Sequence, residues 1–255
     1  FFSCGCTQTY TSIRYLKEDL PRVRPIVMAT VPRLWESIKV GFEDAVDKMP
    51  MLRKILIKSA ISNSKAYKLA RRKFYFLTID RVSRLEQIIS FIEFLLRYPV
   101  HKISSIFLWP KILIKICGGR LRFPISGGGA IAPHIDSFFE ALGVELLVGY
   151  GLTETSPVLT CRRPWRNIRG GAGQPLPETE IKIVDPETFQ IKKLRQKGLV
   201  LARGPQIMSG YLGKLSESKK VLDAGGWFNT GDLGMLLADG SLILTGRAKD
   251  TIVLS

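Results

Sequence analysis

The sequence is poor in the residues from which metal sites and disulfide frameworks are built. Its 255 residues include four cysteines and two histidines. His101 and His134 are far apart, and only Cys4 and Cys6 have a spacing that one metal ion could use. That pair supplies half of a metal site at most. We therefore expect reduced thiols in an intracellular protein, rather than a zinc site or a disulfide framework.

Long uninterrupted apolar runs are missing as well. The two longest apolar stretches are broken by Glu93, Arg97, Lys111 and Lys115, short of the roughly 18 to 20 residues that a membrane-spanning helix needs. The sequence therefore predicts no transmembrane helix, and no targeting segment is visible after Phe1. Zinc-finger, basic-zipper and RNA-binding signatures are absent too, so we expect no nucleic-acid partner.

Acidic residues are scarce in one long segment. Residues 48–122 contain 17 Lys and Arg against Asp80, Glu86 and Glu93, so this segment holds 14 of the net charge of +16. A positive segment of this kind attracts an acidic protein, an anionic membrane surface, nucleic acid or a polyphosphate ligand. Charge alone does not choose among these partners.

The first half of the chain is predicted to be mainly helical. Residues 26–31 read as a short buried strand, and Thr30 and Pro32 predict the cap and start of a helix. The pattern between about 47 and 121 is helical and basic. One apolar face is spaced as in a helix, and we expect it to pack on the body of the protein, with a helix lying on a membrane surface as the alternative. That face is Ile88, Phe91, Ile92, Leu95 and Leu96.

From residue 122 onward the pattern becomes strand, glycine turn, helix and strand, which is typical of α/β folds with ligand loops at strand ends. Short strands and turns follow after about residue 175, and they indicate a small antiparallel barrel or sheet. We therefore predict an α/β portion over 1–175, with a basic helical insertion at about 47–121, then a small β subdomain over 176–246.

Two glycine-containing loops carry candidate chemistry. In "SGGGA", residues 126–130, three glycines let backbone amides approach a flat or charged ligand, although a sharp turn also needs glycine. In "VGYGLTETSP", residues 148–157, Gly149 and Gly151 let the loop bend towards a base on which the Tyr150 ring could stack.

The same second loop carries oxygen ligands. The Thr153 hydroxyl could bond a phosphate or carboxylate oxygen, and Glu154 is a hard oxygen ligand of the kind that Mg²⁺ accepts beside phosphates. The structural alternative is that both residues cap a turn or a helix.

A third candidate pair lies near the carboxyl end. Asp232 in "GWFNTGDLG" can accept two hydrogen bonds, as the adjacent hydroxyls of a ribose require. Fifteen positions later, Arg247 in "TGRAKD" is a permanent cation that can hold ribose or phosphate oxygens. A turn aspartate and a surface ion pair would explain the two residues equally well if each stood alone.

Taken in order, "GGGA", "GYGLTET", "WFNTGDLG" and "GRAKDTIVLS" resemble the adenylate-forming, AMP-binding superfamily, which includes acyl-CoA synthetases, luciferases and peptide-synthetase adenylation domains. The first 38 residues and the basic insertion are similar to the long-chain branch, most of all to plant plastid long-chain acyl-[acyl-carrier-protein] synthetases. The resemblance covers essentially the whole chain. It implies the central part of the large N-terminal domain of such an enzyme.

The resemblance also implies an activity. A family ligase would join a long-chain fatty acid to the α-phosphate of ATP with Mg²⁺, release pyrophosphate, and pass the acyl group from acyl-AMP to coenzyme A or an acidic acyl carrier protein. It implies residence in the plastid (chloroplast), with peripheral membrane contact left open. Positioning two anions and neutralising their charge is the main physical task of such a site.

The resemblance assigns roles to individual residues. Tyr150, held between Gly149 and Gly151, would stack on adenine, Thr153 would contact a phosphate or acyl oxygen, and Glu154 would bind Mg²⁺. Asp232 and Arg247 would hold the ribose, and Lys249 would be the hinge in a segment, 247–255, that leads to a C-terminal domain. The loop that borders adenine would be Gly127, Gly128, Gly129 and Ala130.

The sequence departs from the family pattern at its two ends. The phosphate loop and the upstream acyl tunnel, expected before residue 1, are absent, and so are the C-terminal domain and its catalytic lysine. We therefore expect a fragment with little or no ligase activity alone. Two alternatives remain, a non-catalytic nucleotide- or partner-binding module and a basic docking surface as the main function, the latter probed at Arg71, Arg72 and Lys73.

Overall fold

The computed structural model describes residues 5–12 and 14–248, and Cys4 and Lys249 lie outside the described residues. The chain divides into two compact units. The first unit comprises the described residues up to Tyr75, then Val82–Ile125 and His134–Leu146. The second comprises Phe76–Arg81, Ser126–Pro133 and the described residues from Leu147 onward. The predicted domain boundaries at 175 and 246 stay predictions.

The first unit is mainly helical, as the sequence predicts. Among its described residues, two short neighbouring strands, β1 and β2, accompany six helices. The strands are β1 (Val27–Thr30) and β2 (Phe123–Ser126), and the helices are α1 (Leu16–Val23), α2 (Pro32–Asp47), α3 (Met51–Phe74), α4 (Arg84–Phe107), α5 (Trp109–Cys117) and α6 (Pro133–Ala141).

Pro32 begins α2 at its first position, as predicted, but Thr30 does not cap the helix. The N-cap residue is Val31, which makes no side-chain cap. The Thr30 hydroxyl instead donates to the Ile125 carbonyl at 2.8 Å and accepts a hydrogen bond from Trp35 Nε1 at 2.8 Å. Thr30 therefore joins β1 to β2 and α2, because its hydroxyl has closer partners than the helix end.

Aromatic packing and one ion pair hold the helices of this unit together. Trp35 of α2 meets Phe139 of α6 edge to face, with ring centroids 4.9 Å apart. Arg72 of α3 donates from Nε to Glu140 Oε1 of α6 at 2.7 Å, and both residues are buried. A buried pair of this kind is costly to break. Residues 71–73 therefore do not form a uniformly exposed basic surface, because Arg72 is buried.

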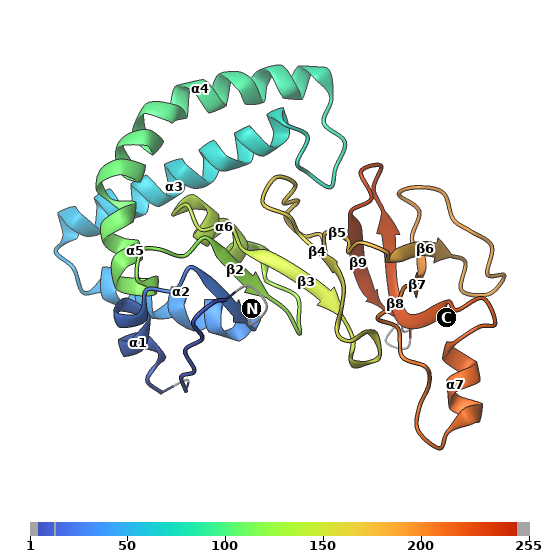
Figure 1. Ribbon diagram of the computed structural model, residues 1–255. Helices are drawn as coiled ribbons and strands as arrows, with labels where there is room; N and C mark the ends of the chain where they lie inside the picture. Colours follow the sequence, from blue (N-terminus) through green and yellow to red (C-terminus); the bar gives the residue numbers. More distant parts are fainter. Residues whose placement is uncertain (1–4, 13, 249–255) are drawn as a thin grey trace, which may run out of the picture. The chain divides into compact units, whose positions relative to one another are not determined.

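Helices α3 and α4 form a long antiparallel hairpin, shown in Figure 1 as two neighbouring helices in cyan and green. A capping box starts α4, in which the Ser83 hydroxyl accepts from Glu86 N and the Glu86 carboxylate accepts from Ser83 N. Between the helices, the Tyr67 and His101 rings stack with centroids 4.1 Å apart.

The apolar face that the sequence assigns to α4 is largely open, although its Phe91 ring contacts the Phe74 ring of α3 with centroids 4.9 Å apart. Its five residues, at positions 88, 91, 92, 95 and 96, are all exposed, and Leu96 retains 75% of its accessible surface. The buried positions of the helix are Ser90 and Ser104. For the described residues, the expectation that this face packs on the protein is met at Phe91 and wrong at the other four positions.

The second unit is built mainly from antiparallel strands. β3, β4 and β5 are consecutive neighbours, and so are β6, β7, β8 and β9. The elements are β3 (Leu147–Gly151), η2 (Thr153–Thr155), β4 (Val158–Cys161), β5 (Gln174–Pro175), β6 (Glu180–Val184), β7 (Gly198–Arg203), α7 (Leu215–Val221), β8 (Phe228–Leu236) and β9 (Leu242–Arg247).

The predicted small barrel or sheet is an open four-stranded sheet in the part of the chain that the structure describes, with β6 and β9 at its edges. Within this sheet, β8 is one continuous strand with an irregular register against both β7 and β9. One core cluster of the second unit consists of Ala172, Ile183, Val200 and Leu242.

Among the described helices, none has an apolar stretch long enough to cross a bilayer.

Candidate functional site

The β8–β9 hairpin places Asp232 opposite Arg247, and this register explains the fifteen-residue spacing between them. Their Cα atoms are partners in the antiparallel ladder, and Arg247 Nε donates to Asp232 Oδ1 at 3.1 Å. The tight turn at 237–241 closes the hairpin, with Gly240 at φ 80°. Asp232 is 6% exposed, whereas the Arg247 side chain is largely open to solvent. The pair thus combines a fixed carboxylate with an accessible cation.

A bulge in β8 fixes the direction of the Asp232 carboxylate. Gly231 has φ 70°, a backbone conformation that favours glycine, and its N–H donates to Asn229 Oδ1 at 2.9 Å. The Thr230 hydroxyl accepts from Asp232 N at 3.1 Å and donates to the Val200 carbonyl at 2.9 Å. Bulges often change the direction of side chains beside functional sites. In this bulge, hydrogen bonds hold the backbone at Gly231 and at Asp232.

Tyr150 reaches the same carboxylate from β3. Its hydroxyl donates to Asp232 Oδ2 at 2.6 Å, and its ring packs against the core cluster of the second unit. Burial, and then the hydrogen bond to the Asp232 carboxylate, raise the pKa of Tyr150. The phenol therefore stays protonated and acts as a donor. The structure thus brings together three predicted site residues from three separate segments, Tyr150, Asp232 and Arg247.

The two glycine loops lie beside one another. The segment from Gly127 to Ala130 follows β2, and a Cβ added to Gly127 would stand 3.7 Å from the Gly149 carbonyl oxygen. Gly128, Gly129 and Ala130 are exposed, as a loop that receives a ligand would require.

Gly151 has a structural reason to be glycine. A Cβ at this position would overlap the Pro157 carbonyl, because the chain turns back closely after β3. At Gly149 the nearest atom to such a Cβ would be the Thr160 carbonyl oxygen at 4.0 Å, an ordinary contact. The close turn at 151–157 therefore needs this glycine whether or not a ligand binds.

Thr153 and Glu154 lie on the short helix η2, which the Thr155 side chain holds in place. Leu152 N donates to Thr155 Oγ1 at 2.9 Å, and that hydroxyl also contacts the Pro157 carbonyl at 2.6 Å. Thr155 is fully buried, whereas Thr153 is exposed and Glu154 is half-buried. The buried threonine thus serves the turn, and its two neighbours are left accessible.

Glu154 has partners that the sequence did not suggest. The Tyr211 hydroxyl donates to Glu154 Oε1 at 2.9 Å, and Met208 N donates to the Glu154 carbonyl at 2.9 Å. The hydrogen bond to Glu154 raises the pKa of Tyr211. Sequence reasoning missed Tyr211 and Thr230, and the only signal for Tyr211 was a second Gly-Tyr pair at 210–211.

The described residues contain no group of three or more His, Cys, Asp or Glu side chains that could hold a metal ion. Mg²⁺ does not require such a cage, since it is usually bound through one or two carboxylates together with substrate phosphates. Glu154 fits this pattern, because its carboxylate is half-buried and accepts one hydrogen bond.

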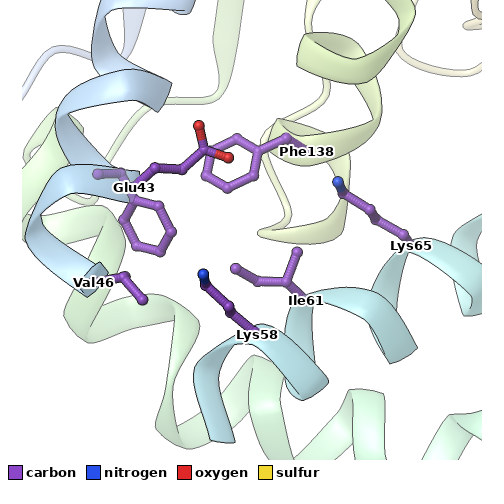
Figure 2. Close-up of a pocket in the computed structure, with 7 residues that line it drawn as sticks. Glu43, Val46, Lys58, Ile61, Lys65 and Phe138 are labelled. Atoms are coloured by element: carbon purple, nitrogen blue, oxygen red, sulfur yellow. The ribbon is translucent and has the colours of Figure 1, made fainter. Parts of the chain in front are cut away.

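A surface pocket of about 180 Å³ lies elsewhere, in the first unit. Figure 2 shows it between α2, α3 and α6, with Phe138 and Ile61 beside Lys58 and Lys65. Glu43 on its rim is paired with Lys39 at 2.6 Å. None of the predicted site residues lines this pocket, so it is separate from the Tyr150–Asp232–Arg247 cluster.

With this geometry in place, comparison with known proteins gives the family. The sequence profile described as "AMP-binding enzyme" matches residues 1–212, and the chain belongs to this family.

Named relatives are long-chain fatty-acid ligases. The chloroplastic long-chain-fatty-acid–[acyl-carrier-protein] ligase AEE15 of Arabidopsis thaliana is 40% identical over 272 residues, which cover 100% of this chain and 37% of that protein. Long-chain-fatty-acid–CoA ligase 1 of Schizosaccharomyces pombe is 30% identical, covering 95% of this chain and 32% of that protein. The chain thus spans about a third of the length of these relatives.

The chain is also similar to a solved structure. The anthranilate CoA ligase AuaEII, in complex with anthranoyl-AMP, is 26% identical with a TM-score of 0.51, and the match covers 62% of this chain and 30% of that one.

Proposed function

We propose that this chain supplies the adenosine-binding part of a ligase that activates a long-chain fatty acid as acyl-AMP and transfers it to a thiol. The observation that carries the proposal is the meeting of Tyr150, Asp232 and Arg247, with contacts of 2.6 and 3.1 Å to one nearly buried carboxylate. Membership of the AMP-binding family and the ligase names of the relatives support it.

Each residue of the proposed site has a role that suits its chemistry. The Tyr150 ring stacks on adenine beside the segment from Gly127 to Ala130. Asp232 accepts from the ribose hydroxyls and Arg247 donates to ribose oxygens. Thr153 donates to a phosphate or acyl oxygen. Mg²⁺ held by Glu154 neutralises charge on the phosphates.

Nucleotide binding tests the proposal directly. Calorimetric titration of the 255-residue chain with AMP should show binding that Tyr150→Ala weakens by about 1–3 kcal/mol, the usual value of a base–aromatic stack. Tyr150→Phe should retain most of the affinity. Tyr10→Ala, at an exposed position of the first unit, is the matched control. Unchanged AMP affinity in both Tyr150→Ala and Asp232→Ala would refute the proposed site.

The chain on its own is proposed to have little or no ligase activity. Residues for the β- and γ-phosphates and the catalytic lysine were not found in the sequence, and the proposed hinge, Lys249 within 247–255, lies outside the described residues. Fatty-acid-dependent pyrophosphate exchange should therefore be absent from the 255-residue chain. Measurable exchange would show that this chain carries the whole adenylation site.

The acceptor thiol is proposed to belong to an acidic acyl carrier protein or to coenzyme A, in a plastid, with peripheral membrane contact. Support comes from the carrier-protein and chloroplast terms in the name of AEE15 and from the CoA ligase of fission yeast. Both acceptors are anionic, so both suit the basic segment at 48–122.

The structure corrects how a basic docking surface should be probed. Arg72 is buried against Glu140 and is unsuitable for charge reversal. Arg71 is exposed and Lys73 is half-buried. Reversing these two should weaken carrier-protein binding measured by titration, whereas unchanged binding would remove α3 as the docking surface. The non-catalytic module remains the alternative, and pyrophosphate exchange in a longer chain that includes the phosphate loop would exclude it.

A further inference from the structure

Helix α4 carries an exposed aliphatic surface, part of which lines a pocket together with Asn63 of α3. The members of this surface, called here the α4 stripe, recur three or four positions apart, with adjacent pairs at 88/89 and 106/107, and therefore share one broad face of the helix. All of them are exposed: Leu85, Ile88, Ile89, Ile92, Leu96, Val100, Ile103, Ile106 and Phe107. In Figure 1 no other described element of the first unit covers the outer side of α4.

The face of α4 in contact with α3 combines polar and aromatic side chains, since Phe94 stacks on Tyr67 with ring centroids 5.0 Å apart. Ser90 and Ser104 are its buried residues, and the His101 ring accepts or donates a hydrogen bond at 2.9 Å to Ser64 of α3. A surface helix normally buries its aliphatic face and exposes its polar face. An apolar surface of this length, left open, usually marks an interaction site.

Basic side chains run along one edge of the stripe. Arg84 and Lys102 are exposed, and each precedes a stripe residue by one turn, Ile88 and Ile106 respectively. Exposed Lys111 and Lys115 follow in α5. Long basic side chains in this position can extend to anionic head groups while their stems lie along apolar surface.

The acidic residues at the other edge are already engaged. Glu93 accepts from Arg97 Nε at 2.8 Å, and Glu86 is bound into the capping box with Ser83. The charge that the edge of the stripe offers to a partner is therefore positive.

We propose that the α4 stripe docks on an anionic lipid surface, with α4 lying in the plane of the interface. An aliphatic face flanked by Arg and Lys is the pattern of interfacial helices, where buried apolar area and attraction to acidic lipids add. A second copy of the chain fits less well, since two-fold packing of the stripes would bring Arg84 of one copy near Lys102 of the other. The choice of a bilayer rests on the proposed function, whose fatty-acid substrate dissolves in membranes.

Vesicle sedimentation tests the docking surface. The 255-residue chain should bind vesicles of phosphatidylcholine mixed with phosphatidylglycerol, and the double variant Ile92→Glu/Leu96→Glu should bind more than about tenfold more weakly, because two apolar contacts become charges. The matched control is Ile191→Glu/Leu194→Glu, two exposed aliphatic positions of the second unit. This control should bind as the wild type does.

Charge is tested separately from apolar contact. Arg84→Glu/Lys102→Glu should weaken binding to the mixed vesicles by about fivefold or more for each cation replaced. It should change binding to pure phosphatidylcholine little. Circular dichroism of each variant checks that the helices persist.

Three outcomes overturn the proposal. The first is that the wild type and the stripe variant bind vesicles equally. The second is that the wild type binds no vesicles and the stripe variant loses a dimer, and the third is that the stripe variant binds carrier protein more weakly while its vesicle binding is unchanged. AMP titration of the same samples separates the two proposals. If the wild type binds AMP but not vesicles, only the proposed role of the α4 stripe is refuted. If it binds vesicles but not AMP, only the proposed function is refuted.

Discussion

The Tyr150–Asp232–Arg247 cluster buries a charged side chain, whereas the α4 stripe exposes apolar side chains. Asp232 is almost completely buried, and its carboxylate accepts from Tyr150 and Arg247. The α4 stripe leaves nine aliphatic and aromatic side chains exposed while serines of the same helix are buried. The side chains of the first region are held by contacts within the chain, whereas the second region leaves its apolar surface open.

The largest effect should follow from breaking the buried ion pair of the first unit. Arg72→Leu removes the cation that donates to the buried Glu140 carboxylate, and removing one partner of a buried pair typically costs about 3–5 kcal/mol. Urea denaturation followed by circular dichroism measures this loss. The double variant Arg72→Leu/Glu140→Leu should recover much of the stability, because it removes both charges of the pair. A single variant that loses less than about 1 kcal/mol would mean that the pair is solvated.

A smaller effect is expected at the turn after β3 in the second unit. Gly151→Ala places a methyl group against the Pro157 carbonyl, and overpacking of this kind costs about 1–3 kcal/mol. Gly149→Ala, two residues earlier, meets only an ordinary contact and serves as the control. The unfolding free energies of the two variants compare them directly. Equal stability would show that the 151–157 turn relaxes at no cost.

The sequence predicts the residues of the cluster better than it predicts their contacts. Motif order identified Asp232 and Arg247, and the hairpin register accounts for their spacing. The roles of Thr230 and Tyr211 were missed, because each acts through a neighbour rather than through a motif of its own.

The basic hairpin was predicted less well. Periodicity indicated a helix correctly, but it assumes that the apolar face is the buried one, and in α4 that face is exposed. In the run at 71–73, composition does not reveal which cation meets Glu140, 68 positions away along the chain from Arg72. Contacts between residues so distant in sequence arise from helix packing, which local patterns do not encode.

His101, which contacts Tyr67 and Ser64 of α3, should make the stability of the first unit depend on pH. Burial, and then the positive charges of Lys68, Arg71 and Lys102, lower the pKa of His101 to about 4 from the usual 6.5. As pH falls below about 6.5 the unfolded chain takes up this proton first, so stability is complete above that pH and is lost as pH falls towards 4. Because the ring is only half-buried, we expect a loss of about 1–2 kcal/mol.

His101→Gln removes the titrating ring and should flatten this part of the stability profile. Urea midpoints measured between pH 4 and pH 7 for the variant and the wild type give the comparison. His134→Gln, on α6 rather than in the α3–α4 hairpin, is the control. A wild-type profile that is flat across this range, or one that His101→Gln leaves unchanged, would contradict the prediction.

The smallest effect should come from the contact between Tyr211 and Glu154 in the second unit. Tyr211→Phe removes a hydroxyl that donates to Glu154 at 2.9 Å near the protein surface, so the loss of unfolding free energy should stay below about 1 kcal/mol. Tyr75→Phe, an exposed tyrosine of the first unit, is the matched control. If Tyr211 instead fixes the Glu154 carboxylate for Mg²⁺, the variant should weaken Mg²⁺-dependent ATP binding while AMP binding without metal stays unchanged. Equal weakening of both would show that Tyr211 supports the fold of the 206–211 segment rather than the carboxylate.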